Sequence, residues 1–113
     1  MHKFLITLLF LSSVFTSFAN AEPVYIHVND MSLVKYQATK DNKIYFRNLS
    51  QFNSDVTGCC YAFYLDISTD FGKAAWSTML MKMASKQDLY LYVTESRPPR
   101  QGAPAQIIQI GNW

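Results

Sequence analysis

The chain has only 113 residues and a formal net charge of +2 at pH 7. This length allows one hydrophobic core of modest size and leaves no room for a second domain. A nearly neutral chain lacks the basic stripe that nucleic-acid binding requires, so nucleic acid is not expected as a partner.

Residues 1–21 have the three parts of a secretory signal peptide. They are a positive start at Lys3, an apolar run from residue 4 to residue 11, and Ala19-Asn20-Ala21 at the exit. Serine and threonine residues interrupt the apolar stretch, which is too short for a membrane span of roughly 20 apolar residues. We therefore expect cleavage after Ala21 and an exported chain, periplasmic or secreted, with no membrane span. The mature domain is residues 22–113, and loss of Lys3 lowers its formal charge from +2 to +1.

Two strands are predicted before residue 48. Residues 24–28 alternate between aliphatic side chains and Tyr or His, which is typical of a half-buried strand. After a turn-favouring Asn-Asp pair, residues 33–38 are expected to continue as the bent second half of that strand. Residues 40–43 form a polar tip, and residues 44–47 make a second strand that pairs back as a hairpin.

A third strand and a helix follow a polar loop. Residues 61–67 alternate again, with Tyr61, Phe63, Leu65 and Ile67 on one face. Side chains of residues 68–70 can cap a helix start, and the helix is predicted over residues 70–86. Its apolar stripe repeats every four residues, as an amphipathic helix requires. The stripe consists of Phe71, Ala75, Met79 and Met83 and is widened by Ala74, Trp76, Leu80 and Ala84.

The last two strands are residues 89–94 and 105–110, separated by a proline-containing loop at 97–104 that cannot pair inside a sheet. The predicted fold class is therefore mainly β with one helix. Three strands, a helix and two strands is the order of a five-stranded OB-type barrel, in which the helix plugs one open end. The alternative is an open α+β sheet with the helix packed on one face.

Few residues suggest catalysis. His27 is the only histidine of the mature chain and is expected to point outward beside Tyr25, so no Ser-His-Asp triad can be assembled. Asp66 and Asp70 flank the helix start, where Asp70 is expected to cap or charge the helix. We therefore predict no catalytic residue, no metal ligand and no cofactor; a small hydrolase is the remote alternative.

The two cysteines are adjacent, Cys59 and Cys60. An exported protein favours disulfides, but neighbouring Cα atoms lie about 3.8 Å apart, closer than the roughly 4.4–6.8 Å of ordinary bridges. A strained vicinal disulfide, a bond to another chain and two reduced thiols all stay open. Two cysteines alone fall short of a zinc site.

Five tyrosines lie opposite the inward aliphatic positions of their strands. Tyrosine offers flat apolar area and a hydroxyl, which suits sugar stacking or a subunit interface. It is also a good strand former, so ordinary sheet packing is a third interpretation. Tyr64, Tyr90 and Tyr92 are the candidate ligand contacts, and the full set adds Tyr25 and Tyr45.

The helix and the strand after it carry a family resemblance. Residues 65–82, LDISTDFGKAAWSTMLMK, and residues 86–93, KQDLYLYV, resemble the binding subunits of pertussis-like toxins, including the subtilase cytotoxin B subunit. The resemblance implies an OB-type barrel, a ring of five subunits and glycan binding. Family members often have one cysteine before strand three, where Cys59 lies, and another after strand four, where residues 94–96 hold none.

Together these features predict an exported, non-enzymatic binding module whose partner is a glycan or a protein. The alternative is a periplasmic interaction or inhibitor protein.

Overall fold

The computed structural model describes residues 23–56, 60–95 and 104–113. The predicted signal peptide and most of the proline-containing loop lie outside the described residues. The described elements are β1 (Val24–Val28), the 3-10 helix η2 (Met31–Leu33), β2 (Tyr36–Thr39), β3 (Lys43–Phe46), the 3-10 helix η3 (Leu49–Gln51), β4 (Phe63–Asp66), α1 (Asp70–Ser85), β5 (Leu89–Val93) and β6 (Ala105–Gly111).

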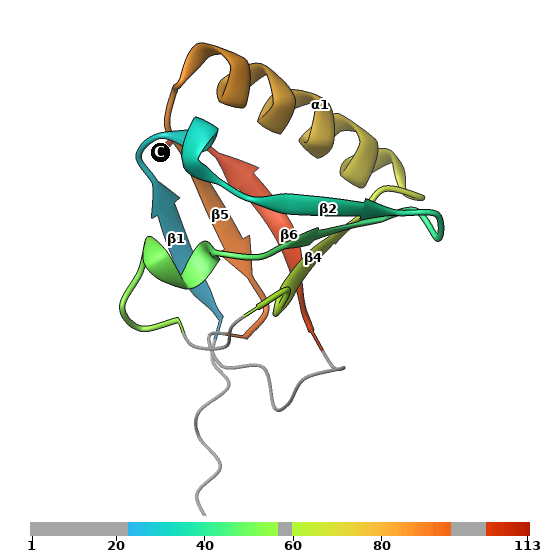
Figure 1. The fold of residues 1–113 in the computed structure, drawn as a ribbon, viewed down its shortest axis with the longest axis horizontal. Helices are drawn as coiled ribbons and strands as arrows, with labels where there is room; N and C mark the ends of the chain where they lie inside the picture. The colour runs from blue at the N-terminus through green and yellow to red at the C-terminus, as the bar shows by residue number, and fades with distance from the viewer. Residues whose placement is uncertain (1–22, 57–59, 96–103) are drawn as a thin grey trace, which may run out of the picture.

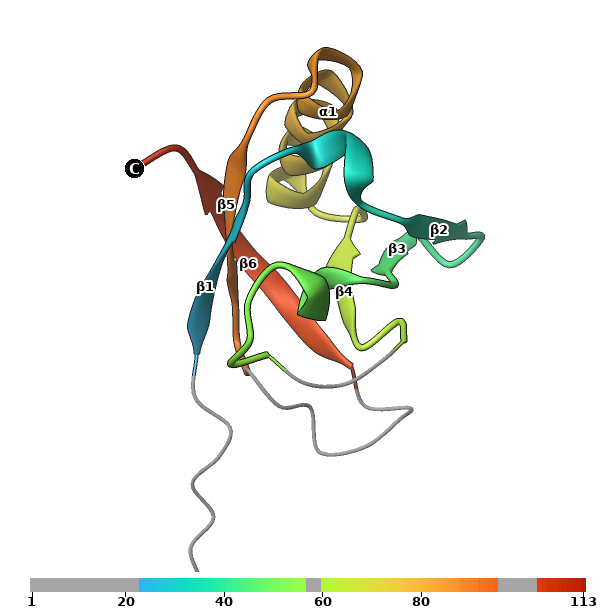
Figure 2. The ribbon, with the colours of Figure 1, turned by 60° about the vertical axis from the view of Figure 1, so that its left-hand side comes forward.

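The six strands form one mixed sheet in the order β1-β5-β6-β4-β3-β2. Neighbouring strands are antiparallel except for β4 and β6, which run parallel. Strands β1 and β2 are the two edges, so hydrogen bonds do not close the sheet. Figure 2 shows β1 and β5 on one side of the molecule, β2 and β3 on the other, and β6 and β4 between them. The prediction of a mainly β fold with one helix is confirmed, with six strands where five were predicted.

Helix α1 begins where it was predicted to begin and ends one residue earlier. The Thr69 side chain accepts a hydrogen bond from the Gly72 backbone N–H at 2.9 Å and caps the first turn. Asp70 does not cap the helix; it lies in the first turn, where a negative charge favours the helix dipole. Lys86 adopts the left-handed conformation with φ 58° and ends the helix.

The helix crosses one end of the curled sheet, above the strand ends (Figures 1 and 2). Ala75 and Met79 are buried in the common core, and Met83 packs against it, as the apolar stripe predicts. The prediction was wrong for Phe71, Ala74, Leu80 and Ala84, which are exposed because only the side of α1 that carries Ala75 and Met79 faces the sheet. Within the described residues no helix is long and apolar enough to cross a membrane.

The first predicted strand is divided by η2. The Asp30 carboxylate accepts hydrogen bonds from the backbone N–H and the hydroxyl of Ser32, which stabilises a turn in place of extended chain. Met31 is buried and donates its N–H to the Gln87 carbonyl, which fixes the turn beside the end of α1. Pairing resumes only at Tyr36, and β1 and β2 become separate strands at opposite edges of the sheet.

Strand β4 is shorter than the predicted 61–67. Tyr61 has φ 63°, a left-handed conformation that a bulky residue rarely adopts and that interrupts the extended chain. Its side chain is therefore exposed, although it was predicted to face inward. Phe63 and Leu65 are buried, as the alternation predicts.

Candidate functional site

Two aromatic pairs lie across β1 and β5. The antiparallel register places Tyr25 opposite Tyr92 and His27 opposite Tyr90. The Tyr25 and Tyr92 ring centroids are 4.4 Å apart with the rings tilted by 39°, and the His27 and Tyr90 rings stack at 4.2 Å and 15°. The strands alternate, so Ile26 and the other aliphatic residues face the core while these four rings lie together on the outer face.

Trp113, two residues beyond the end of β6, extends the group. Its ring lies 5.1 Å from the Tyr25 ring in an edge-on arrangement and stacks on Tyr90 at 5.4 Å. A Cβ atom on Gly111 would stand 2.1 Å from the Trp113 ring, so glycine is what allows the indole to fold back over the strand end. We call Tyr25, His27, Tyr90, Tyr92 and Trp113 the aromatic face.

The aromatic face is open to solvent. Tyr25 is 47% exposed and Trp113 is 55% exposed, while Tyr90 and Tyr92 are half-buried between them. Contiguous aromatic area of this kind is unusual on a small soluble domain and typically marks a binding surface. The structure thus joins flat apolar rings with phenol hydroxyl and indole N–H groups in one patch.

A hydrogen-bonded side-chain pair, His27 and Asp88, lies at the edge of the aromatic face. The His27 Nε2 and Asp88 Oδ2 atoms are 2.9 Å apart and form a hydrogen bond at the start of β5. This bond is the main reason why the pKa of Asp88 lies below its ordinary value, so the carboxylate stays ionised at neutral pH. The pair fixes the imidazole ring over Tyr90 and supplies polar atoms at the rim of the patch.

Two of the three predicted ligand residues belong to the aromatic face. Tyr90 and Tyr92 do, but Tyr64 lies on β4, where it faces Tyr45 at 5.9 Å and has the Lys43 ammonium 6.0 Å from its ring centroid. Tyr64 therefore belongs to a separate, smaller cluster on β3 and β4.

Sequence reasoning missed Trp113 as a site residue, and it treated His27 as an outward-pointing polar residue without a role in a site. The alternation that turns Tyr25 outward also turns His27 outward, and this signal was sufficient to find His27. No local pattern could place Trp113, because its position depends on the chain path after Gly111.

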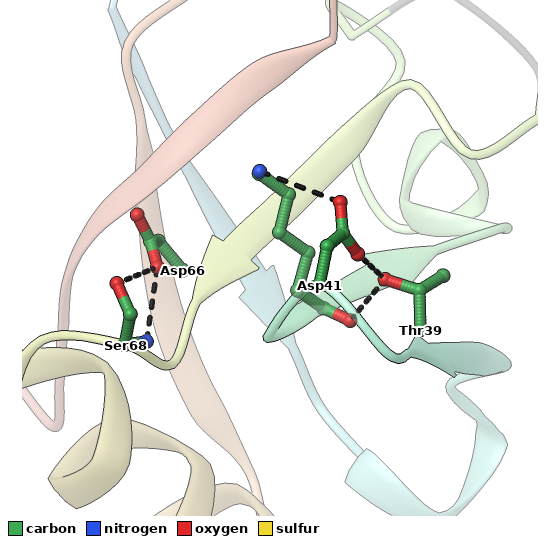
Figure 3. Close-up of polar contacts among 5 residues, drawn as sticks. Thr39, Asp41, Asp66 and Ser68 are labelled. Carbon is green, nitrogen blue, oxygen red and sulfur yellow. Dashed lines mark hydrogen bonds and ion pairs between the residues drawn. The ribbon is translucent and has the colours of Figure 1, made fainter.

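The acidic residues near the helix start have structural partners. The Asp66 carboxylate accepts hydrogen bonds from the Ser68 N–H at 3.0 Å and the Ser68 hydroxyl at 2.7 Å (Figure 3). Both bonds lower the pKa of Asp66, and the bond from the Ser68 hydroxyl has the larger effect. A carboxylate that stays ionised in this way is a poor general acid at neutral pH.

The Asp41 carboxylate, at the hairpin tip between β2 and β3, also has structural partners. Asp41 accepts a hydrogen bond from the Thr39 hydroxyl (Figure 3). The Asp41 carboxylate also lies 3.6 Å from the Lys43 ammonium. The Thr39 bond is the main cause that lowers the pKa of Asp41. Over the described residues, no group of three His, Cys, Asp or Glu side chains is placed to hold a metal ion.

Cys60 is disulfide-bonded, so the interpretation as two reduced thiols is wrong for this residue. Cys59 lies outside the described residues. Cys60 itself is half-buried and lines a hollow beside β2 and β3.

Comparisons of this chain with protein-family models, with curated proteins and with solved structures find no match. A function for the chain must therefore follow from the aromatic face and from the surfaces around it.

Proposed function

We propose that this chain is an exported, non-enzymatic binding module whose aromatic face stacks on the sugar rings of a glycan. The observation that carries the proposal is the continuous group of rings from β1, β5 and the segment after β6, with centroid spacings of 4.2 to 5.4 Å. One face of a sugar ring presents C–H groups, which pack on aromatic rings, while its hydroxyls need polar partners at the edge. The Tyr hydroxyls and the His27–Asp88 pair supply such partners.

The strand pairing supports the finer proposal of an OB-type barrel. If β1 and β2 are taken as the two halves of one long strand bent at η2, five strands remain. The first half pairs with β5 and the second half with β3, and the parallel β4–β6 pair joins the two sides. The two edges of the sheet then belong to the same strand, as in a partly open barrel. OB-type barrels bind oligosaccharides among other ligands, which agrees with the proposed function.

A glycan array on residues 22–113 tests the glycan proposal, followed by fluorescence titration with the best glycan. Trp113→Ala is expected to weaken binding by about tenfold or more, since 1.4 kcal/mol of lost stacking corresponds to a factor of ten. The variant should also abolish the fluorescence change on binding, because Trp76 packs against the core away from the aromatic face. Tyr64→Ala is the control, because Tyr64 lies outside the aromatic face.

An array without a bound glycan would contradict the proposal. So would a Trp113→Ala variant that binds as tightly as the unchanged protein. Thermal unfolding of each variant shows that any loss of binding is not a loss of fold.

A second candidate function is self-association through the outer face of α1. Between Ala74 and Ala84 this face carries no charged side chain, because residues three or four apart share one side of a helix and Lys82 lies on another side. Leu80 and Met81 are exposed there. The strip consists of Ala74, Ser77, Leu80, Met81 and Ala84, all of them exposed. An exposed apolar helix face fits a subunit interface, and the resemblance to toxin subunits implies a ring of five chains.

Light scattering on residues 22–113 measures the number of chains directly. We expect an oligomer, which Met81→Lys converts to single chains because a buried, unpaired ammonium is costly at an interface. Ile108→Lys is the control, since Ile108 is also exposed but lies on β6. A single chain at all concentrations would contradict self-association and leave the glycan proposal standing.

A further inference from the structure

A basic hollow of about 230 Å³ lies beside the start of β2 and the end of β3, and no residue of the aromatic face lines it. Two cationic side chains, Lys35 and Arg47, line it, and none of the described lining residues carries a carboxylate. The remaining lining residues are Asn48, Ser50, Gln51 and Cys60.

The backbone forces the two cations together. Tyr36 pairs with Phe46 at the end of the β2–β3 ladder, and the Arg47 N–H donates to the Lys35 carbonyl at 2.8 Å. Lys35 and Arg47 therefore face each other as the next cross-strand pair. Like charges in this arrangement repel each other and destabilise a sheet.

Neither cation has an internal counter-ion in the described part of the chain. The ion pairs found there are His27–Asp88 and Lys43–Asp41. Both Lys35 and Arg47 are exposed at the mouth of the hollow. A bound anion would therefore offset the repulsion between Lys35 and Arg47, which no described side chain neutralises.

Asn48 holds the hollow in shape. It is only 6% exposed, and its Oδ1 atom accepts a hydrogen bond from the Lys35 N–H at 2.8 Å. Its Nδ2 group donates to the Leu33 carbonyl at 3.0 Å and to Gln51 Oε1 at 3.3 Å. Because the Gln51 oxygen is engaged, the Gln51 amide NH₂ is left to donate elsewhere.

The lining therefore offers donors of several kinds. Arg47 presents a planar fork of N–H groups that matches an oxyanion in a bidentate manner, and Lys35 adds a point charge. Ser50 and the Gln51 amide add neutral donors. The volume is below the roughly 300–1,000 Å³ of pockets that hold drug-sized ligands, so one small group fits better than a whole sugar.

We propose that the hollow between Lys35 and Arg47 binds one small oxyanion: a sulfate, phosphate or carboxylate group, either free or carried on a saccharide. The site is independent of the aromatic face.

The test is an NMR titration of residues 22–113 with sodium sulfate, with sodium chloride at matched ionic strength as the reference. Saturable shifts are expected at the Arg47 side-chain N–H and at the Ser50 and Gln51 amides, with sulfate only. Arg47→Ala is expected to weaken sulfate binding by about tenfold or more, and Arg47→Lys by less, because lysine keeps the charge without the fork. Lys73→Ala removes the same charge from α1 and should leave binding unchanged.

Two further arms identify the source of the anion. A sulfated monosaccharide that binds more tightly than both its unsulfated parent and free sulfate assigns the oxyanion to a saccharide, whereas tighter binding of free sulfate assigns it to an inorganic ion. Trp113→Ala should leave sulfate binding unchanged, so failure of the glycan proposal and failure of this one are distinguishable. An equal response to chloride, or full sulfate binding by a folded Arg47→Ala variant, would overturn the proposal.

Discussion

Replacing Gly72 with alanine is expected to destabilise the protein severely, by at least about 3 kcal/mol, the upper range for overpacking a tight site. Gly72 is buried in the first turn of α1, directly against the end of β4. A Cβ atom at this position would stand 1.8 Å from the Asp66 carbonyl oxygen and 2.9 Å from the Ile67 Cα atom. Both are backbone atoms, so no side-chain rotation relieves the clash. The helix must move away from the strand that precedes it.

Helix propensity alone gives the opposite sign for this substitution. Alanine favours a helix interior over glycine by about 0.8–1.0 kcal/mol, so a surface glycine replaced by alanine would stabilise α1. Ala74→Gly, at an exposed position two residues away, is the matched control and should cost only about 1 kcal/mol. Urea unfolding of residues 22–113 measures both variants. A Gly72→Ala variant as stable as the unchanged protein would show that α1 does not rest on the Asp66–Ile67 backbone.

Met79→Ala is expected to cost about 2–5 kcal/mol, the usual range for a long buried side chain cut back to alanine. Met79 is 0% exposed and is the largest fully buried side chain that α1 contributes to the core. Its removal leaves a cavity between the helix and the curled sheet, since the surrounding strands can relax only in part. The free energy of unfolding, from urea melts, is the quantity to measure.

Two control variants separate burial from residue type. Met79→Leu keeps most of the volume and should cost less than about 1.5 kcal/mol. Met81→Ala changes the same residue type on the same helix, but Met81 is 57% exposed, so its effect on the single chain should stay within about 0.5 kcal/mol. Equal losses for Met79→Ala and Met81→Ala would mean that α1 does not pack on the sheet through its buried side.

The elements with a clear short-range pattern were predictable. The alternation at residues 24–28 and 89–93 placed β1 and β5 with their buried faces correct, because side chains two residues apart on a strand share a face. The helix was predicted to within one residue, since Thr69 and Lys86 supply its two ends locally. The predictions for Phe71, for Tyr61 and for the extended segment near Leu33 were wrong. Phe71 depends on which side of α1 meets the sheet, Tyr61 on its own left-handed conformation, and the segment near Leu33 on the turn at Asp30.

The candidate sites show the same division. The outward direction of Tyr25, His27, Tyr90 and Tyr92 follows from the sequence, but their contacts depend on the pairing of β1 with β5, which are more than 60 residues apart. Trp113 reaches them only through the path of β6 past Gly111.

The sequence by itself determined the helix, and it determined β1 and β5 with the side of each that faces the core, because these depend on neighbours within about four residues. Only the tertiary structure decided which tyrosines meet, and that Lys35 and Arg47 share one hollow. The reason is physical: strand register is set by pairing between distant segments, and a one-residue slip would turn every side chain to the opposite face.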